Sequence, residues 1–372
     1  MELTESGYLR PVGVNPPDEQ PRAARVFKRA CPGRQVVAKR PQGSVRHPLL
    51  GSYFGAWEAW AIDPTIRDRG SSGGALTAIQ GWLIEAGMAA ELTTATADES
   101  QPVRTVPIQI TTKAEALAAA GSRYAPVGIG QSVTIHPDHA ITAKPCEVAA
   151  VRAMASEDPS KSPILLSFFC AGTPSQLATE KLVRDLGGPE PEKVTALWYR
   201  GRGWPGRFTA VHGDGEVSTD YRSSWGDSLG PATQWRCKIC PDGVGESADI
   251  AAADSWEVSE GGYPVFGENA GRSALLARTE RGHAIILAAH QAKVIELQPL
   301  DVSKLAEAQP LQTTRRKYLA ARLLGTRLAG RPVPRFRGFS LLRLSIASPR
   351  MAVRTLRGTF RRVRRAKLKR ER

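Results

Sequence analysis

The stretch I-L-L-S-F-F-C-A-G-T-P-S-Q-L-A-T-E-K-L-V-R-D-L, residues 164–186, contains the unit that decides the fold. Ile164–Phe169 is a run of mostly apolar residues, which predicts a buried strand. Glycine and proline follow Cys170, and these residues are typical of a turn. Gln176–Leu186 then has the apolar spacing of a helix. A strand, a turn and a helix in this order are the building unit of an α/β protein.

The same alternation occurs on both sides of this stretch. We expect further strands over residues 103–110, 132–141, 194–199, 208–212 and 274–278, and helices over residues 77–89, 114–120, 147–154 and 284–292. The sequence therefore predicts an α/β, or mixed α+β, fold with mixed sheets flanked by helices. We expect four parts: an irregular N-terminal segment (1–45), two domains (46–128 and 129–300) and a basic tail (301–372).

The positive charge of the chain is concentrated at one end. The whole chain carries +15, but residues 315–372 contain 20 Lys and Arg and one acid, a net +19 that leaves −4 for the rest. Two basic helices are expected there, over 305–330 and 341–369, separated by Pro332 and Pro334. The tail is either a solvated extension or a binding segment for an anionic partner: membrane lipid, an acidic protein or, last, nucleic acid.

No targeting or spanning segment is expected. The first residues, M-E-L-T-E, lack the basic and apolar regions of a signal peptide. No run reaches the ~18 apolar residues of a transmembrane helix. We expect a cytoplasmic protein, with a peripheral position at the inner face of the membrane as an alternative. In the reducing cytosol, grouped cysteines bind metal or do chemistry more often than they form disulfides.

Four of the five cysteines are placed as candidate metal ligands. Cys237 and Cys240 lie in W-R-C-K-I-C-P-D, Cys146 in K-P-C-E and Cys170 in F-F-C-A-G-T-P. A tight Cys-x-x-Cys turn aims two sulfurs at one point, and four thiolates are the number that a cubane iron–sulfur cluster requires. A zinc half-site, a redox dithiol and ordinary buried cysteines remain alternatives.

Two loops are candidates for contact with a nucleotide cofactor. Arg69-Gly-Ser-Ser-Gly-Gly precedes the helix expected from Thr77, and glycines before a helix N-terminus allow close approach of a phosphate. The loop lacks the Walker and dinucleotide patterns, and a plain turn with a serine N-cap is the alternative. The second is Ala120-Gly-Ser-Arg-Tyr, for which the alternative is a glycine C-cap.

Taken together, these motifs resemble the coenzyme F420 hydrogenase/dehydrogenase beta-subunit family. The resemblance rests on R-x-x-G-S-S-G-G-A-L-T-A, A-G-S-R-Y-A-P, K-P-C-E, F-F-C-A-G-T-P-S, C-K-I-C-P-D-G-x-G-E-S-A-D-I and G-R-S-A-L-L-A-R-T-E-R-G. The order and spacing match over about residues 45–295. Each motif is weak alone, whereas the joint match is specific.

The resemblance implies a flavoprotein with FAD and a [4Fe–4S] cluster. It implies that Cys146, Cys170, Cys237 and Cys240 ligate the cluster. It also implies that FAD is contacted by two sets of residues: Gly70, Ser71, Ser72, Gly73, Gly74 and Thr77, and then Gly121, Ser122, Arg123 and Tyr124. The resemblance further implies that residues 46–128 form the flavin-binding domain and that residues 129–300 form the iron–sulfur/flavin domain.

This chain departs from the family pattern at two places. Only Cys31 remains of the family's cysteine-rich N-terminal region, so we expect one cluster. The family's G-T-P-C-Q is A-K-P-C-E here, which makes Lys144 a candidate tuner of the flavin or an ordinary surface lysine. Asp249 and Asp254 are interpreted as structural, and no histidine lies in a matched motif.

The function expected from the resemblance is electron transfer between the cluster, FAD and a second redox partner, with coenzyme F420 as the first candidate. One alternative is a ferredoxin-fed reductase of a sugar, lipid or isoprenoid intermediate in polysaccharide synthesis. The other is an electron-transfer subunit without turnover of its own. The expected partner is ferredoxin, a hydrogenase or dehydrogenase subunit, or a small-molecule substrate.

Overall fold

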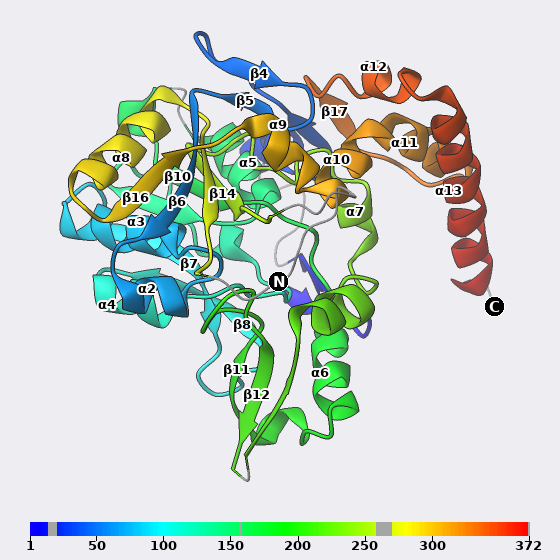
Figure 1. The fold of residues 1–372 in the computed structure, drawn as a ribbon. Coiled ribbons are helices and arrows are strands. Elements are labelled where there is room, and N and C mark those ends of the chain that lie inside the picture. Colours follow the sequence, from blue (N-terminus) through cyan, green and yellow to red (C-terminus); the bar gives the residue numbers. More distant parts are fainter. Residues whose placement is uncertain (14–20, 156–157, 214, 258–269, 371–372) are drawn as a thin grey trace.

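A computed structural model describes residues 1–13, 21–155, 158–213, 215–257 and 270–370. An eight-stranded sheet forms its centre, with the strand order β16-β6-β15-β14-β10-β9-β7-β8 (Figure 1). The bounds of these strands are Gly55–Ala61 (β6), Glu91–Ala97 (β7), Thr105–Ile110 (β8), His139–Thr142 (β9), Ile164–Phe168 (β10), Ile250–Asp254 (β14), Ser273–Ala277 (β15) and Ile295–Pro299 (β16).

The middle of the sheet is parallel and its edges are antiparallel. Strands β7, β9, β10 and β14 pair in parallel, whereas β8, β15, β6 and β16 join the sheet in antiparallel pairs. The α/β prediction with a mixed sheet is therefore confirmed. Strands from both sides of residue 128 share this one sheet, and the expected division into domains stays a prediction.

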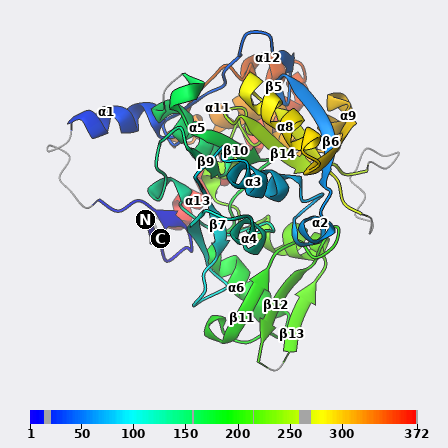
Figure 2. The same cartoon turned by 90° about the vertical axis from the view of Figure 1, so that its left-hand side faces the viewer.

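Helices cover both faces of the sheet because its strands are apolar on both faces. In β10, Ile164 and Leu166 belong to one core cluster, whereas Leu165 belongs to another on the opposite face. The first cluster is closed by α3 (Ala75–Glu85) and α8 (Glu280–Gln291), and the second by α5 (Pro145–Met154) (Figure 2). Short helices α2 (Pro64–Arg69) and α4 (Lys113–Ala118) lie next to α3.

A second, smaller lobe lies below the sheet in Figure 1. It contains the antiparallel strands β11 (Val194–Trp198), β12 (Phe208–His212) and β13 (Gly215–Thr219), helix α6 (Gln176–Asp185) and the π-helix η5 (Arg222–Leu229). Its core contains Leu182, Leu197 and Phe208. Short 3₁₀ turns occur at Ile129–Gln131 (η2), Pro159–Lys161 (η3) and Pro191–Lys193 (η4), and α7 (Trp235–Lys238) carries the first cysteine of the Cys-x-x-Cys pair.

The two ends of the chain are more structured than the sequence predicts. The expected irregular segment contains β1 (Glu2–Leu3), β2 (Leu9–Arg10), α1 (Pro21–Ala30) and β3 (Gln35–Val37), and the hairpin β4 (Val45–His47) and β5 (Gly51–Tyr53) follows. The C-terminal part contains α9 (Val302–Glu307), α10 (Pro310–Lys317), α11 (Leu319–Leu328), α12 (Leu341–Ile346) and α13 (Pro349–Arg370). Strand β17 (Arg335–Arg337) pairs with β3, which ties the two ends together.

Four expected elements need correction. The basic helix predicted over 341–369 is two helices, α12 and α13, and Pro349 begins the second of them. The strand predicted over 132–141 is confined to β9, because Pro137 and Asp138 interrupt the run with a turn. The basic helix predicted over 305–330 is three helices, and Pro310 begins the second of them. Helix α8 begins before the predicted Ala284, because Thr279 caps it by accepting a hydrogen bond from the Gly282 N–H at 3.0 Å.

Among the described residues, no helix combines the length and the apolar character needed to cross a membrane.

Candidate functional site

A cavity of about 690 Å³ lies where the parallel strands of the large sheet end. Thr142, Phe168 and Asp254, at the carboxyl ends of β9, β10 and β14, line it together with residues of the smaller lobe. Open α/β sheets bind ligands at this edge, because the loops that follow parallel strands meet there. The volume is in the range of small-molecule and cofactor sites.

The predicted glycine-rich loop borders this cavity. Ser71, Ser72, Gly74 and Thr77 all line it. Gly74 is the N-cap of α3 with a left-handed φ of 69°, and no side chain caps the helix there. The serine N-cap considered from the sequence is therefore absent. The N–H groups of the first helical turn keep their capacity to bind an anion.

Gly70 and Gly73 lie in the same loop but do not line the cavity. A Cβ atom on Gly73 would lie 2.6 Å from the carbonyl oxygen of Ala59 and 2.9 Å from the backbone nitrogen of Ser273. A Cβ atom on Gly70 would lie 2.9 Å from the carbonyl oxygen of Ile66. These two glycines let the loop pack against strands β6 and β15 and against α2.

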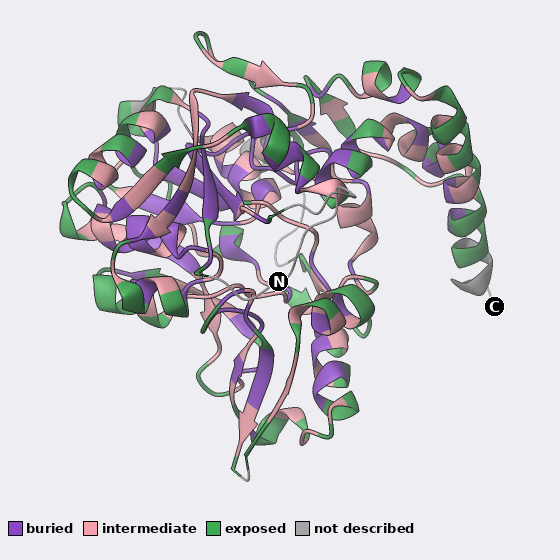
Figure 3. Cartoon of the chain, in the orientation of Figure 1, coloured by how far each residue is buried: buried purple, intermediate pink, exposed green. Residues whose placement is uncertain are grey.

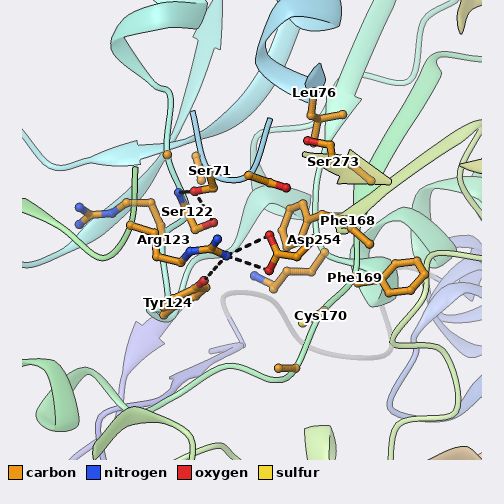
Figure 4. Close-up of a pocket in the computed structure, with 18 of the residues that line it drawn as sticks. Ser71, Leu76, Ser122, Arg123, Tyr124, Phe168, Phe169, Cys170, Asp254 and Ser273 are labelled. Carbon is orange, nitrogen blue, oxygen red and sulfur yellow. Dashed lines mark hydrogen bonds and ion pairs between the residues drawn. The ribbon is translucent and has the colours of Figure 1, made fainter. Parts of the chain in front are cut away.

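The second predicted segment contacts the first loop directly (Figure 4). Ser122 donates from its backbone N–H to Ser71 Oγ at 2.8 Å, and the two hydroxyls are also 2.8 Å apart. Gly121, Ser122, Arg123 and Tyr124 line the cavity. The two loops, 51 residues apart in the sequence, therefore form one wall.

The guanidinium of Arg123 donates mainly to backbone carbonyl oxygens. It donates to the carbonyl oxygens of Leu197 at 2.6 Å, Pro102 at 2.8 Å and Arg104 at 2.7 Å. These bonds connect β8 to the smaller lobe. Burial lowers the pKa of Arg123, and Tyr199 opposes this shift only in part. The side chain points away from the cavity in Figure 4.

Lys144 is half-buried beside the cavity, at the N-cap of α5. Its ammonium donates to the Val127 carbonyl oxygen at 2.7 Å and pairs with Glu147 at 3.0 Å. Burial alone would lower the pKa of Lys144, but Glu147 outweighs it and the pKa lies above its ordinary value. Lys144 is thus a fixed cation at the wall of the cavity, not a surface lysine.

The four candidate cysteines lie near one another, and one of them reaches the cavity. Cys146 lies at the start of α5, Cys170 follows β10, and Cys237 and Cys240 flank the turn at the end of α7. Cys146 interacts electrostatically with Cys170 and Cys240, and Cys170 interacts with Cys237 and Cys240. Cys170 also lines the cavity.

The four cysteines are half-buried, and the sulfurs of Cys237 and Cys240 each take part in a hydrogen bond. Burial, then Cys237, raises the pKa of Cys170 to about 12, and Arg315 opposes the rise. Cys237 Sγ accepts from the Thr173 N–H at 3.4 Å, and Cys240 Sγ donates to the Asp242 carbonyl oxygen at 3.3 Å. Within the described part of the chain, no group of three or more His, Cys, Asp or Glu side chains lies close enough to hold a metal ion.

The sequence interpretation missed the ion pair of Arg200 and Asp254. Arg200 Nη1 donates to both Asp254 oxygens, at 3.1 and 2.9 Å, and both residues line the cavity (Figure 4). The Arg200 guanidinium also lies over the rings of Trp204, Tyr221 and Trp256, 4.7–5.4 Å from their centroids. In the sequence, Asp254 could have been noticed as an acid at the end of a strand, close before Trp256, whereas no sequence pattern marks Arg200.

Asp249, by contrast, has a structural role, because Arg152 and Arg281 form ion pairs with it at 2.9 and 2.6 Å.

The sequence interpretation predicted a helix over the residues of α10 but missed that this helix borders the cavity. Gln309, Leu311 and Gln312 line the cavity, and Gln312 donates from Nε2 to the Cys170 carbonyl oxygen at 3.0 Å. This helix belongs to the expected basic tail, so the first part of that tail contributes to the site.

Two family models match the chain. Residues 56–133 match the N-terminal model of the coenzyme F420 hydrogenase/dehydrogenase beta subunit, and residues 138–303 match its C-terminal model. The chain belongs to this family. The family resemblance seen in the sequence is therefore confirmed.

Two related proteins agree with this assignment to the family. The coenzyme F420 hydrogenase subunit beta of Methanococcus voltae is 25% identical over 300 residues, covering 77% of this chain and 99% of that protein. The F420-dependent formate dehydrogenase 1 subunit beta of Methanococcus maripaludis is 24% identical over 233 residues, covering 61% of this chain. This chain spans 57% of the length of that second relative.

A solved structure shares the fold of this family member. A chain of the F420-reducing [NiFe] hydrogenase complex from Methanosarcina barkeri superimposes with a TM-score of 0.58 at 20% identity, covering 78% of this chain and 98% of that one. Residues 304–372, which include α10 to α13, lie outside both family models.

Proposed function

We propose that this chain is an electron-transfer subunit of an F420-linked oxidoreductase that carries FAD and one [4Fe–4S] cluster. The family and the names of its relatives support an F420-linked redox complex. The cavity and the cysteine group support the two resident cofactors. A hydrogenase or dehydrogenase subunit, or ferredoxin, would supply or accept the electrons.

The residues around the cavity fit FAD. The uncapped start of α3, with Ser71, Ser72 and Gly74, offers N–H and hydroxyl groups to a pyrophosphate. Leu76, Phe168 and Trp225 supply apolar walls for a flat ring system. A branched side chain at Gly74, with its left-handed φ, would strain this wall. Thr77, Gly121, Ser122 and Tyr124 complete the proposed FAD contacts.

The cysteines fit a [4Fe–4S] cluster in number and chemistry. Cys146, Cys170, Cys237 and Cys240 would hold it, and Cys31 would not. A single ion needs its ligands in direct contact around one point, whereas a cubane spaces its four thiolates at the corners of a larger unit. The four thiols lie near one another but do not surround a single point closely, and this arrangement suits a cubane cluster.

The observation that carries the proposal is the position of Cys170. It belongs to the cysteine group and also lines the cavity, so a flavin and a cluster bound at these places would be neighbours. When bound, the flavin would exchange a hydride with F420 and single electrons with the cluster. Lys144 would hold a positive charge between the two, which favours an anionic reduced flavin.

Arg200 would orient the ring system at the other side of the cavity. Its Nη2 is buried and makes no hydrogen bond within the described part of the chain, whereas Nε and Nη1 donate to the Pro205 carbonyl oxygen and to Asp254. A carbonyl oxygen of a planar cofactor would satisfy this donor. We infer that Arg200 is held in place by Asp254 for that purpose.

F420 reduction tests the assignment of the second substrate. Anaerobically purified chain containing flavin and iron would be supplied with a reduced viologen dye and F420. We expect loss of the F420 absorbance, and a Cys240→Ser variant, which cannot hold the cluster, should slow this reaction. A chain that holds both cofactors but leaves F420 unchanged would overturn the F420 assignment and favour a reductase of another substrate.

We also propose that the basic C-terminal helices attach the protein to an anionic membrane surface. Leu342 and Ile346 are 68% and 64% exposed on one face of α12, and Met351 and Val353 of α13 are 42% and 49% exposed. Exposed arginines, among them Arg354, lie on the same helix as the last two. Apolar and cationic side chains together suit a lipid interface.

A further inference from the structure

Helix α10 brings two buried side chains against the cysteine turns. Gln312 is 5% exposed and Arg315 is 7% exposed, although both lie in the strongly basic part of the sequence. The helix follows the end of the C-terminal family model at residue 303. These side chains are therefore contributed by a part of the chain that the family models do not include.

Arg315 connects two separate cysteine turns through their carbonyl oxygens. Its Nη2 donates to the Cys170 carbonyl at 3.1 Å, and its Nη1 donates to the carbonyls of Ala171 and Cys237 at 3.3 and 3.2 Å. Gln312 also donates to the Cys170 carbonyl and accepts from Arg315. One guanidinium thus fixes the turn after β10 relative to the end of α7.

The cysteine loop is shaped to admit this guanidinium. A Cβ atom on Gly243, in the C-P-D-G sequence after Cys240, would lie 2.0 Å from Arg315 Nη2 and 2.1 Å from Gln312 Oε1. The absence of a side chain at Gly243 therefore leaves the space that these two residues occupy. The next helix adds a further bond, from Arg322 to the Lys238 carbonyl oxygen at 2.6 Å.

We propose that Arg315 is a positioning residue that holds the cysteine turns for the cluster and raises the reduction potential of the cluster. This inference rests on the proposed function. A cluster becomes more negative when it accepts an electron, so a fixed cation beside two of its ligands stabilises the reduced form. The carbonyl bonds keep the ligand-bearing turns at their spacing, which slows cluster loss.

The test compares Arg315→Gln with Lys317→Gln. Both changes remove one positive charge from α10, but Lys317 is exposed and its side chain makes no hydrogen bond or ion pair to any residue that the structure describes. In anaerobically reconstituted full-length protein, a redox titration followed by electron paramagnetic resonance should give a more negative cluster potential for Arg315→Gln. Cluster loss to a chelator should be about 10–100-fold faster than in the wild type. Lys317→Gln should match the wild type in both.

Arg315→Lys keeps the charge and loses the forked donor, so it separates the two effects. We expect faster cluster loss with a potential close to that of the wild type, and this variant decides the positioning role if Arg315→Gln does not fold. Equal potentials and equal loss rates in the Arg315 and Lys317 variants would overturn the inference. A wild-type chain that takes up no iron would instead overturn the proposed function.

Discussion

At the residue scale, Arg200 and Asp254 form an ion pair in the wall of the cavity. The Arg200 side chain is 2% exposed and that of Asp254 is 20% exposed. Burial alone would lower the pKa of Arg200, but Asp254 and the nearby tyrosines more than offset it and hold the pKa above its ordinary value. Arg200 is therefore a permanent cation whose position depends on one carboxylate.

Asp254→Asn should weaken both the fold and flavin binding. It leaves a buried guanidinium without its counter-charge, which costs about 3 kcal/mol. We expect a lower thermal midpoint and flavin affinity reduced about tenfold, because Arg200 loses its orientation. Asp227→Asn, an exposed change in η5 of the smaller lobe, is the control. Unchanged flavin affinity in a folded Asp254→Asn protein would show that Arg200 does not contribute to flavin binding.

Asp249 provides a pH-dependent contribution to stability. Burial would raise the pKa of its carboxyl, but Arg152, Arg281 and the Leu165 N–H hold it below the ordinary value. A depressed folded-state pKa gives stability that is present above about pH 4 and is lost as the pH falls through the folded value.

Asp249→Asn should therefore destabilise the protein most at neutral pH, by about 3–5 kcal/mol. The difference in free energy of unfolding between wild type and variant should narrow below about pH 4. Urea unfolding at the two pH values measures this, with the exposed acid Asp227 again as the site of the control change. A difference that stays constant with pH would show that the Asp249 carboxylate is not the source.

At the scale of elements, the glycine-rich loop has two roles that the sequence did not separate. Ser71, Ser72 and Gly74 face the cavity, whereas Gly73 lies against β6 and β15. The Gly73 N–H donates to Ser273 Oγ at 3.0 Å, and its carbonyl oxygen accepts from the Ala61 N–H at 2.8 Å. Gly73 thus attaches the loop to the sheet, and the residues before and after Gly73 can contact a ligand in the cavity.

Gly73→Ala should lower stability more than it lowers flavin affinity. The added methyl group collides with the Ala59 carbonyl, and overpacking of this kind costs about 1–3 kcal/mol. Thermal unfolding and flavin titration of the folded protein measure the two effects. Gly130→Ala, where a Cβ would meet nothing within 4 Å, is the control. A fully stable variant that has lost flavin would instead assign Gly73 to the ligand.

The sequence predicted the elements that have strong periodicity and the motifs that lie next to them. Strand β12 and helix α5 agree closely with their predicted ranges, because local patterns determine them. Arg200, Trp256 and Gln312 were missed, because long-range packing brings them to the cavity and no local pattern marks them. Helix α1 was missed because its amphipathic pattern covers only ten residues and lies in a stretch rich in proline and arginine, which indicated irregular structure.

At the scale of the whole molecule, the basic C-terminal region has an inner and an outer part. Arg315 and Arg316 are buried and bonded to the cysteine turns and to Glu246, respectively. Helix α13 is mostly exposed at the edge of the molecule (Figure 3). Truncation before α10 would therefore remove part of the site, and only the outer helices suit a test of membrane binding.

Replacing Arg354, Arg357 and Arg361 together by Gln should weaken binding to anionic liposomes. Each exposed arginine contributes on the order of 1 kcal/mol at an anionic surface, so about 100-fold weaker co-sedimentation is expected. Gln at Lys113, Lys181 and Lys193, which are exposed elsewhere, removes the same charge as a control. Equal sedimentation of the two triple variants would contradict the membrane proposal.

The cofactor content of the anaerobically purified full-length chain tests the central claim most directly. The account predicts flavin bands and a broad iron–sulfur shoulder in the visible spectrum, with one FAD and about four iron and four sulfide per chain by chemical assay. Replacing Cys170, which lies at both proposed sites, should remove the iron and disturb the flavin. A colourless chain, or one that holds flavin without iron, would contradict the account.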